Sequence, residues 1–153
     1  MLTRALSISL PADTFGGNPV VARAALATLA VLQREGLQAR AAATGAVLLA
    51  GFAALREQYD CIGSVRGVGL MLGLEMLHSR ADAARRPWPE AAYAVVYAMR
   101  ARRILLSCDG MVSNVIKLKP PMVFDEQDAR RVLAELADVL AHLLQHLAAY
   151  HAL

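Results

Sequence analysis

The glycine-rich stretch from Gly63 to Glu75 is the feature that most restricts how this chain can fold. Apolar side chains on both sides of it repeat with helical spacing, and the stretch breaks that period. Glycine disfavours helix, so the stretch needs another structure. Its second half, Gly69 to Leu77, is a short apolar run that predicts a buried strand. The chain therefore combines helices with a sheet.

Capping residues and apolar spacing place the other elements. Asn18 and Pro19 predict a helix start, because asparagine caps a helix and proline suits its first position. Asp125, with Asp128 three residues later, predicts another start. We expect helices over 19–35, 38–58 and 90–102 and from 125 onward, and further strands over 6–10, 104–107 and 114–118. This order predicts an α+β fold, a small antiparallel sheet covered by helices.

Composition limits the function classes. The 153 residues suit one domain, and the 57% hydrophobic content indicates apolar surface that meets a partner or another part of the protein. The longest apolar run, 45–55, is shorter than the ~20 residues of a membrane span. Basic residues occur as scattered pairs without interleaved aromatics, which argues against nucleic-acid binding. Cys61 and Cys108 have no pairing or metal spacing, and we expect a reducing, cytoplasmic location.

Three segments are candidates for binding. Residues 13–19 offer a hydroxyl and glycine amides before a helix start, a plausible anion site or simply a helix cap. The glycines of 65–73 precede a strand, so close backbone packing is the favoured interpretation. Lys117 and Lys119, the only lysines, alternate on one strand and either grip a phosphate or carboxylate or form a solvated face. His142 and His146 lack a third ligand, so we predict no metal site.

Segments taken in order resemble the class III pyridoxal-phosphate-dependent aminotransferases. These are Thr14 to Pro19 (TFGGNP), Val65 to Glu75 (VRGVGLMLGLE), Leu105 to Gly110 (LLSCDG) and Asn114 to Met122 (NVIKLKPPM). The similarity covers about residues 13–145. The last segment is most similar to the branch of alanine–glyoxylate aminotransferase-like proteins and ethanolamine-phosphate phospho-lyases. The resemblance implies that 1–12 are an unmatched lead-in and that 13–153 form the family's C-terminal small domain, as in fold-type I enzymes.

The same resemblance implies roles for two residues. Thr14 corresponds to the threonine that binds the pyridoxal phosphate of the neighbouring subunit. Lys117 stands on the strand that helps to bind substrate, where many members have an arginine. A lysine offers a point charge in place of the bidentate fork of arginine. A phosphorylated or simple amine therefore becomes a possible substrate beside an amino acid and a 2-oxo acid.

The resemblance also implies what this chain does not supply. The family's Schiff-base lysine, the acidic partner of the pyridine nitrogen and the stacking aromatic lie in the large domain, and none is matched here. We therefore expect no catalytic residue in this chain and no transamination by it alone. The expected partners are a large domain or a second subunit. The alternatives are a non-catalytic dimerisation module and part of an amino-alcohol-phosphate phospho-lyase.

Overall fold

The computed structural model describes the backbone of residues 16–150 and the side chains up to residue 143. The predicted strand at 6–10 lies outside the described residues. The chain divides into two compact units, residues 1–36 and residues 37–153.

The first unit contributes one described helix, α1 (Pro19–Arg34). The Asn18 side chain accepts a hydrogen bond of 3.1 Å from the Val21 amide, and Pro19 takes the first helical position, as predicted. Gly36 follows the helix with a φ of 59°, a conformation that glycine adopts without strain. None of the α1 side chains is buried, and Val20, Val21, Leu26 and Leu29 are all more than half exposed.

The second unit is a four-stranded antiparallel sheet with three helices. Its elements in chain order are α2 (Leu37–Gln58), β1 (Ile62–Val68), β2 (Met71–Met76), α3 (Pro89–Ala101), β3 (Ser107–Asp109), β4 (Val115–Leu118) and α4 (Glu126–Tyr150). The strand order is β1-β2-β4-β3. The predicted α+β architecture with a small antiparallel sheet is confirmed.

Two strand predictions need correction. Residues 62–68, which the glycine content had left without an assigned strand, form β1 and pair with β2 as a hairpin. The predicted strand 104–107 overlaps β3 only at Ser107, because Ile104 to Leu106 make no ladder pairs with β4. The helix bounds predicted at 19–35, 38–58 and 90–102 and the start predicted at 125, by contrast, each lie within one residue of the observed positions.

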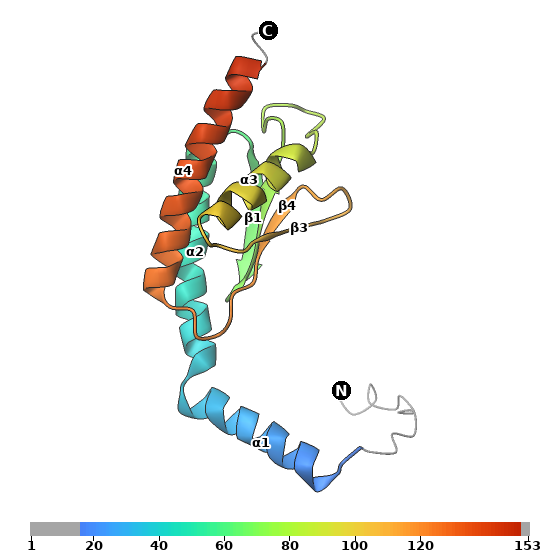
Figure 1. Cartoon of the computed structure of the whole chain (residues 1–153), viewed down its shortest axis with the longest axis vertical. Helices are drawn as coiled ribbons and strands as arrows, with labels where there is room; N and C mark the ends of the chain where they lie inside the picture. Colours follow the sequence, from blue (N-terminus) through green and yellow to red (C-terminus); the bar gives the residue numbers. More distant parts are fainter. Residues whose placement is uncertain (1–15, 151–153) are drawn as a thin grey trace. The chain divides into compact units, whose positions relative to one another are not determined.

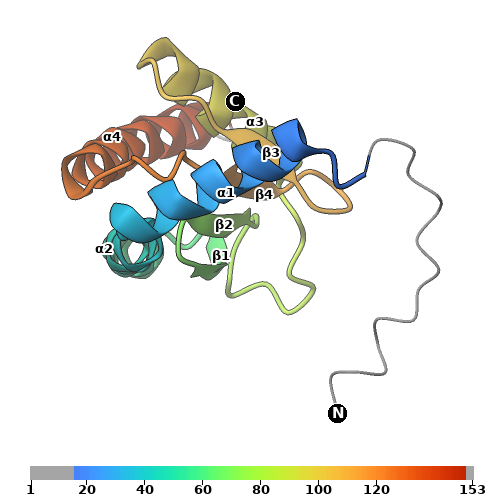
Figure 2. The ribbon, with the colours of Figure 1, turned by 90° about the horizontal axis from the view of Figure 1, so that it is seen from below.

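The three helices cover one face of the sheet (Figures 1 and 2). Strand side chains alternate, so Leu72, Leu74 and Met76 of β2 and Ile116 and Leu118 of β4 point into the core. Helix α2 packs on β1, α3 packs on the β3–β4 side, and α4 lies against both α2 and α3. From α4, Val132, Leu136 and Val139 are buried as predicted. The opposite face of the sheet carries no described helix of this unit.

Helix α2 is long and apolar enough to pass a length-and-composition test for a membrane span. A core helix passes the same test. Leu48, Phe52 and Leu55 of α2 are at most 6% exposed and belong to the core. The prediction that this run does not span a membrane stays a prediction.

Candidate functional site

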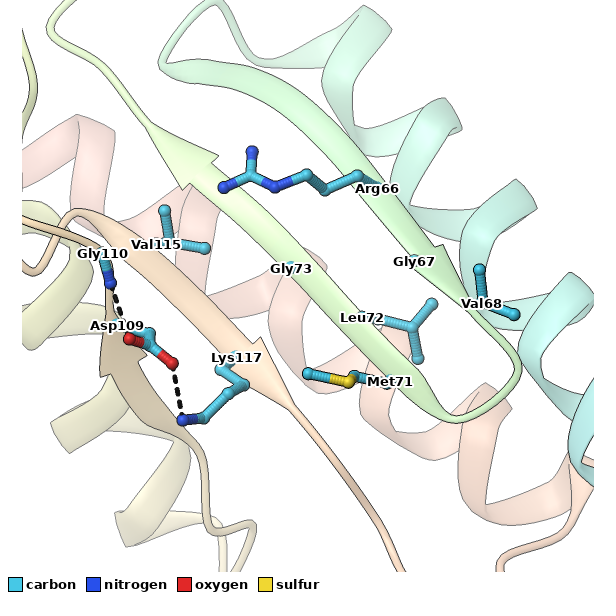
Figure 3. Close-up of a pocket in the computed structure, with 10 residues that line it drawn as sticks. All are labelled: Arg66, Gly67, Val68, Met71, Leu72, Gly73, Asp109, Gly110, Val115 and Lys117. Atoms are coloured by element: carbon cyan, nitrogen blue, oxygen red, sulfur yellow. Dashed lines mark hydrogen bonds and ion pairs between the residues drawn. The ribbon is translucent and has the colours of Figure 1, made fainter. Parts of the chain in front are cut away.

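A cavity of about 600 Å³ opens on the helix-free face of the sheet (Figure 3). It lies over the hairpin formed by β1 and β2, over Val115 and Lys117 of β4, and over the turn at Asp109 and Gly110. Its apolar lining includes Met71 and Val115. Its charged residues are Arg66, Asp109 and Lys117. The cavity therefore combines an apolar wall with an excess of one positive charge.

The strand register aligns the two cations of this cavity. Arg66 of β1 pairs with Gly73 of β2, and Gly73 pairs with Lys117 of β4. The three residues form one row across the sheet, and side chains directly opposite each other project from the same face. Figure 3 shows Gly73 between the other two residues of the row. The sequence pattern predicted a binding role for Lys117 but not for Arg66, which lies in the glycine-rich segment predicted to pack closely.

Lys117 is held by a carboxylate from the neighbouring strand. Its Nζ lies 2.7 Å from Oδ2 of Asp109, and the Gly110 amide donates to the other oxygen of that carboxylate at 2.8 Å. The Lys117 side chain is 34% exposed and that of Asp109 is 57% exposed. The Lys117 hydrogen bond, followed by the Gly110 amide, holds the pKa of Asp109 below its ordinary value of 3.8. An incoming anion must compete with Asp109 for Lys117.

This pairing gives a testable pH dependence. Because the folded-state pKa of Asp109 lies below 3.8, the pair stabilises the fold above that pH and loses its contribution as pH falls through the folded value. Carboxyl-carbon NMR titration should show the Asp109 midpoint rising toward 3.8 in Lys117→Met. In Lys119→Met the midpoint should stay where it is in the unmodified chain. An unchanged midpoint in Lys117→Met would contradict the assigned cause.

Lys119 does not join Lys117 at this cavity. Strand β4 ends at Leu118, and Lys119 lines two other hollows together with Pro120. The two lysines that the sequence pattern placed on one side therefore line different hollows. Lys119 is also exposed, whereas Lys117 is half-buried.

The structure describes some of the other residues that the sequence singled out. Thr14 lies outside the described residues, and its contact with a cofactor phosphate stays a prediction. Close backbone packing in the 65–73 segment is confirmed, because a Cβ on Gly67 would lie 2.4 Å from the Met71 carbonyl oxygen. Cys61 and Cys108 are free thiols, and burial raises the pKa of Cys61 to about 11. Among the described residues no cluster of metal-ligating side chains occurs, and His142 contacts Asp138.

A family model described as aminotransferase class-III matches residues 2–140. The chain belongs to the class III aminotransferase family. Pyridoxal phosphate is the cofactor of that family.

The relatives include enzymes of two kinds. An alanine–glyoxylate aminotransferase 2-like protein of Drosophila melanogaster is 41% identical over 87% of this chain and 27% of its own length. An ethanolamine-phosphate phospho-lyase homologue of Caenorhabditis elegans is 34% identical over 84% of this chain and 27% of its own length. The chain thus spans about a quarter of the length of these curated relatives.

Solved structures agree on the fold. A phospholyase from Arthrobacter, determined in complex with phosphoethanolamine, superposes with a TM-score of 0.76 at 35% identity. That match covers 82% of this chain and 29% of the solved chain. The second unit thus has the architecture found in fold-type I pyridoxal-phosphate enzymes.

The described residues do not by themselves form a complete site for this cofactor. A pyridoxal site needs an amine to bond the aldehyde, an acid near the ring nitrogen and a surface against the ring. The described lining of the cavity contains no aromatic ring, and its one amine is paired with Asp109. The cavity residues fit one wall of an active site. The row that contains Arg66 and Lys117 fits an anionic group.

Proposed function

We propose that this chain forms the substrate-side wall of a pyridoxal-phosphate enzyme that transfers amino groups between an amine or amino acid and a 2-oxo acid. The observation that carries the proposal is the placement of Lys117. It stands on the helix-free face of the sheet, half-buried at a cavity of about 600 Å³. That face carries no described helix of its own unit, and in this proposal it meets the remainder of such an enzyme.

In this proposal each part of the chain has a limited task. When bound, pyridoxal phosphate supplies the electron sink for the chemistry. Lys117 binds and orients the anionic end of the substrate as a point charge. The apolar side chains Met71 and Val115 exclude water around the carbon chain. Thr14 is proposed to hold the cofactor phosphate of a neighbouring subunit, which makes a dimer the proposed working form.

The isolated chain is proposed not to catalyse the reaction. Lys117 and Lys119 are the only lysines in the sequence. Lys117 is engaged by Asp109, and Lys119 is exposed and does not line this cavity. The purified chain should be mixed with pyridoxal phosphate, reduced with borohydride and mapped by mass spectrometry. We expect no stoichiometric label on either lysine, and such a label would overturn this part of the proposal.

A chimera tests the positive part of the proposal. Residues 13–145 of this chain should replace the matching segment of the Drosophila relative. We expect the chimera to bind pyridoxal phosphate and to turn over an amino donor. A folded, cofactor-loaded chimera without turnover would contradict the proposed role. Assays with an amino acid and with phosphoethanolamine separate the transaminase from the phospho-lyase alternative. The observation that supports the phospho-lyase alternative is the 34–35% identity to two phospho-lyase relatives.

A second candidate function is a non-catalytic interaction module. The observation favouring it is α1, whose described side chains are all unburied and include four exposed apolar residues. Such a helix needs apolar cover from another surface. Sedimentation of the purified chain separates the two candidates when it is read together with the chimera. A stable self-associated chain combined with an inactive chimera would favour the module.

A further inference from the structure

We infer that Arg66 and Lys117 act together as a two-cation clamp for a phosphate group, with Gly73 as the open floor between them. The substrate-side location of the clamp rests on the proposed function. The clamp makes Arg66, in addition to Lys117, a residue that determines specificity. The ligand is a phosphomonoester, such as the phosphate end of a phosphorylated amine.

The spacing of the two cations suits one shared oxyanion. Arg66 and Lys117 are separated by one intervening strand, because each pairs with Gly73. Two strand spacings of ~4.8 Å place their Cα atoms about 10 Å apart. Both side chains are long enough to reach a group midway between them. An arginine fork and a lysine point charge together offer donors from two directions.

Gly73 keeps the space between the cations open. A Cβ at this position would lie 3.2 Å from Cγ1 of Val115 and 3.9 Å from Cγ of Arg66. The stem of Arg66 thus passes over Gly73, and any larger side chain here would fill the position of the ligand. Gly73 has no positive φ, so backbone conformation does not explain the glycine. The Val115 methyl group and the Arg66 stem, which a side chain at this position would crowd, do explain it.

The charges around the row favour a dianion over a carboxylate. The Arg66 guanidinium donates to the Ser64 hydroxyl at 2.6 Å, and no described carboxylate pairs with it. Glu75 on the same face is paired with Arg85 at 3.1 Å. Asp109 pairs with Lys117 and not with Arg66. A phosphomonoester carries nearly two negative charges at pH 7, so it can displace Asp109 and engage both cations, whereas a monoanion gains less.

Titration of the full 153-residue chain with inorganic phosphate tests the clamp without any catalysis. Amide and arginine side-chain NMR signals should shift at Arg66, Gly73 and Lys117, and acetate should bind at least tenfold more weakly. Arg66→Gln and Lys117→Gln should each weaken phosphate binding about tenfold. Arg130→Gln is the matched control, because it removes one charge from the helix side of the sheet, where Arg130 pairs with Glu126. Asp109→Asn should tighten phosphate binding.

The outcomes are decisive in both directions. Two results would overturn the clamp. One is the absence of phosphate-induced shifts at Arg66, Gly73 and Lys117. The other is phosphate binding by Arg66→Gln that is as tight as binding by the Arg130→Gln control. Arg66→Lys, which keeps the charge, shows whether loss of binding in Arg66→Gln reflects charge or folding. Phosphoethanolamine and 4-deoxypyridoxine phosphate, which has no aldehyde, distinguish a substrate phosphate from a cofactor phosphate; tighter binding of the second would overturn the substrate assignment. The chimera assay can fail while these titrations succeed, so the two proposals are separable.

Discussion

Gly45→Ala is expected to lower the free energy of unfolding by about 2–3 kcal/mol, although alanine is the better helix former by about 1 kcal/mol. Gly45 is buried in α2, where the helix meets the turn of the β1–β2 hairpin. A Cβ at this position would lie 2.1 Å from the carbonyl oxygen of Gly69 and 2.8 Å from its Cα. Both atoms belong to the backbone, so no side-chain rotation can relieve the overlap.

Gly51→Ala on the same helix is the matched control. The three atoms nearest to a Cβ there all belong to the Leu133 side chain, the closest a methyl carbon at 2.3 Å, and that side chain can change rotamer. Thermal unfolding followed by circular dichroism should show a fall of roughly 6–10 °C for Gly45→Ala. The fall for Gly51→Ala should be clearly smaller. Equal melting temperatures for the two variants would show that α2 does not approach the hairpin as closely as described.

Close packing at two other glycines explains why β1 was not predicted from the sequence. Strand patterns are recognised by alternating large and polar side chains, and β1 has glycine at two of its seven positions. Gly63 and Gly67 leave no side chain because other groups occupy that space, Leu77 near Gly63 and the Met71 carbonyl oxygen near Gly67. Tertiary packing therefore requires glycine at these positions and removes the alternating side-chain pattern that predicts a strand. Helix starts were predictable because capping is local, as at Asn18 and at Asp125.

The candidate site was predictable in part for a similar reason. Lys117 could be singled out by a motif that lies within nine consecutive residues, 114–122. Arg66 could not, because its relation to Lys117 depends on the strand order β1-β2-β4-β3 and on a register through Gly73. Asp109 escaped for the same reason, since it reaches Lys117 only across the β3–β4 pairing. Sequence spacing carries no information about which residues become neighbours across a sheet.

Lys117→Gln in the catalytically complete chimera is expected to lower kcat/KM for a substrate with a distal anion by about 100-fold. Loss of one charge-assisted hydrogen bond contributes 1.5–3 kcal/mol, or roughly 10- to 150-fold. The substitution also leaves the Asp109 carboxylate, now without its cation, beside the incoming anion. For a neutral amine of the same length, kcat/KM should change less than threefold, because neither effect acts on an uncharged substrate end.

Lys119→Gln provides the comparison that isolates position from charge. It removes the same charge two residues away, on a side chain that does not line the cavity of Figure 3. Lys117→Arg should retain activity on the anionic substrate to within about tenfold, because it keeps the charge but changes the donor geometry. If Lys119→Gln were as damaging as Lys117→Gln, the anion would be recognised by the general field of this surface. If kcat/KM falls only for the anionic substrate, and only when Lys117 is replaced, the cavity on the helix-free face is the substrate wall.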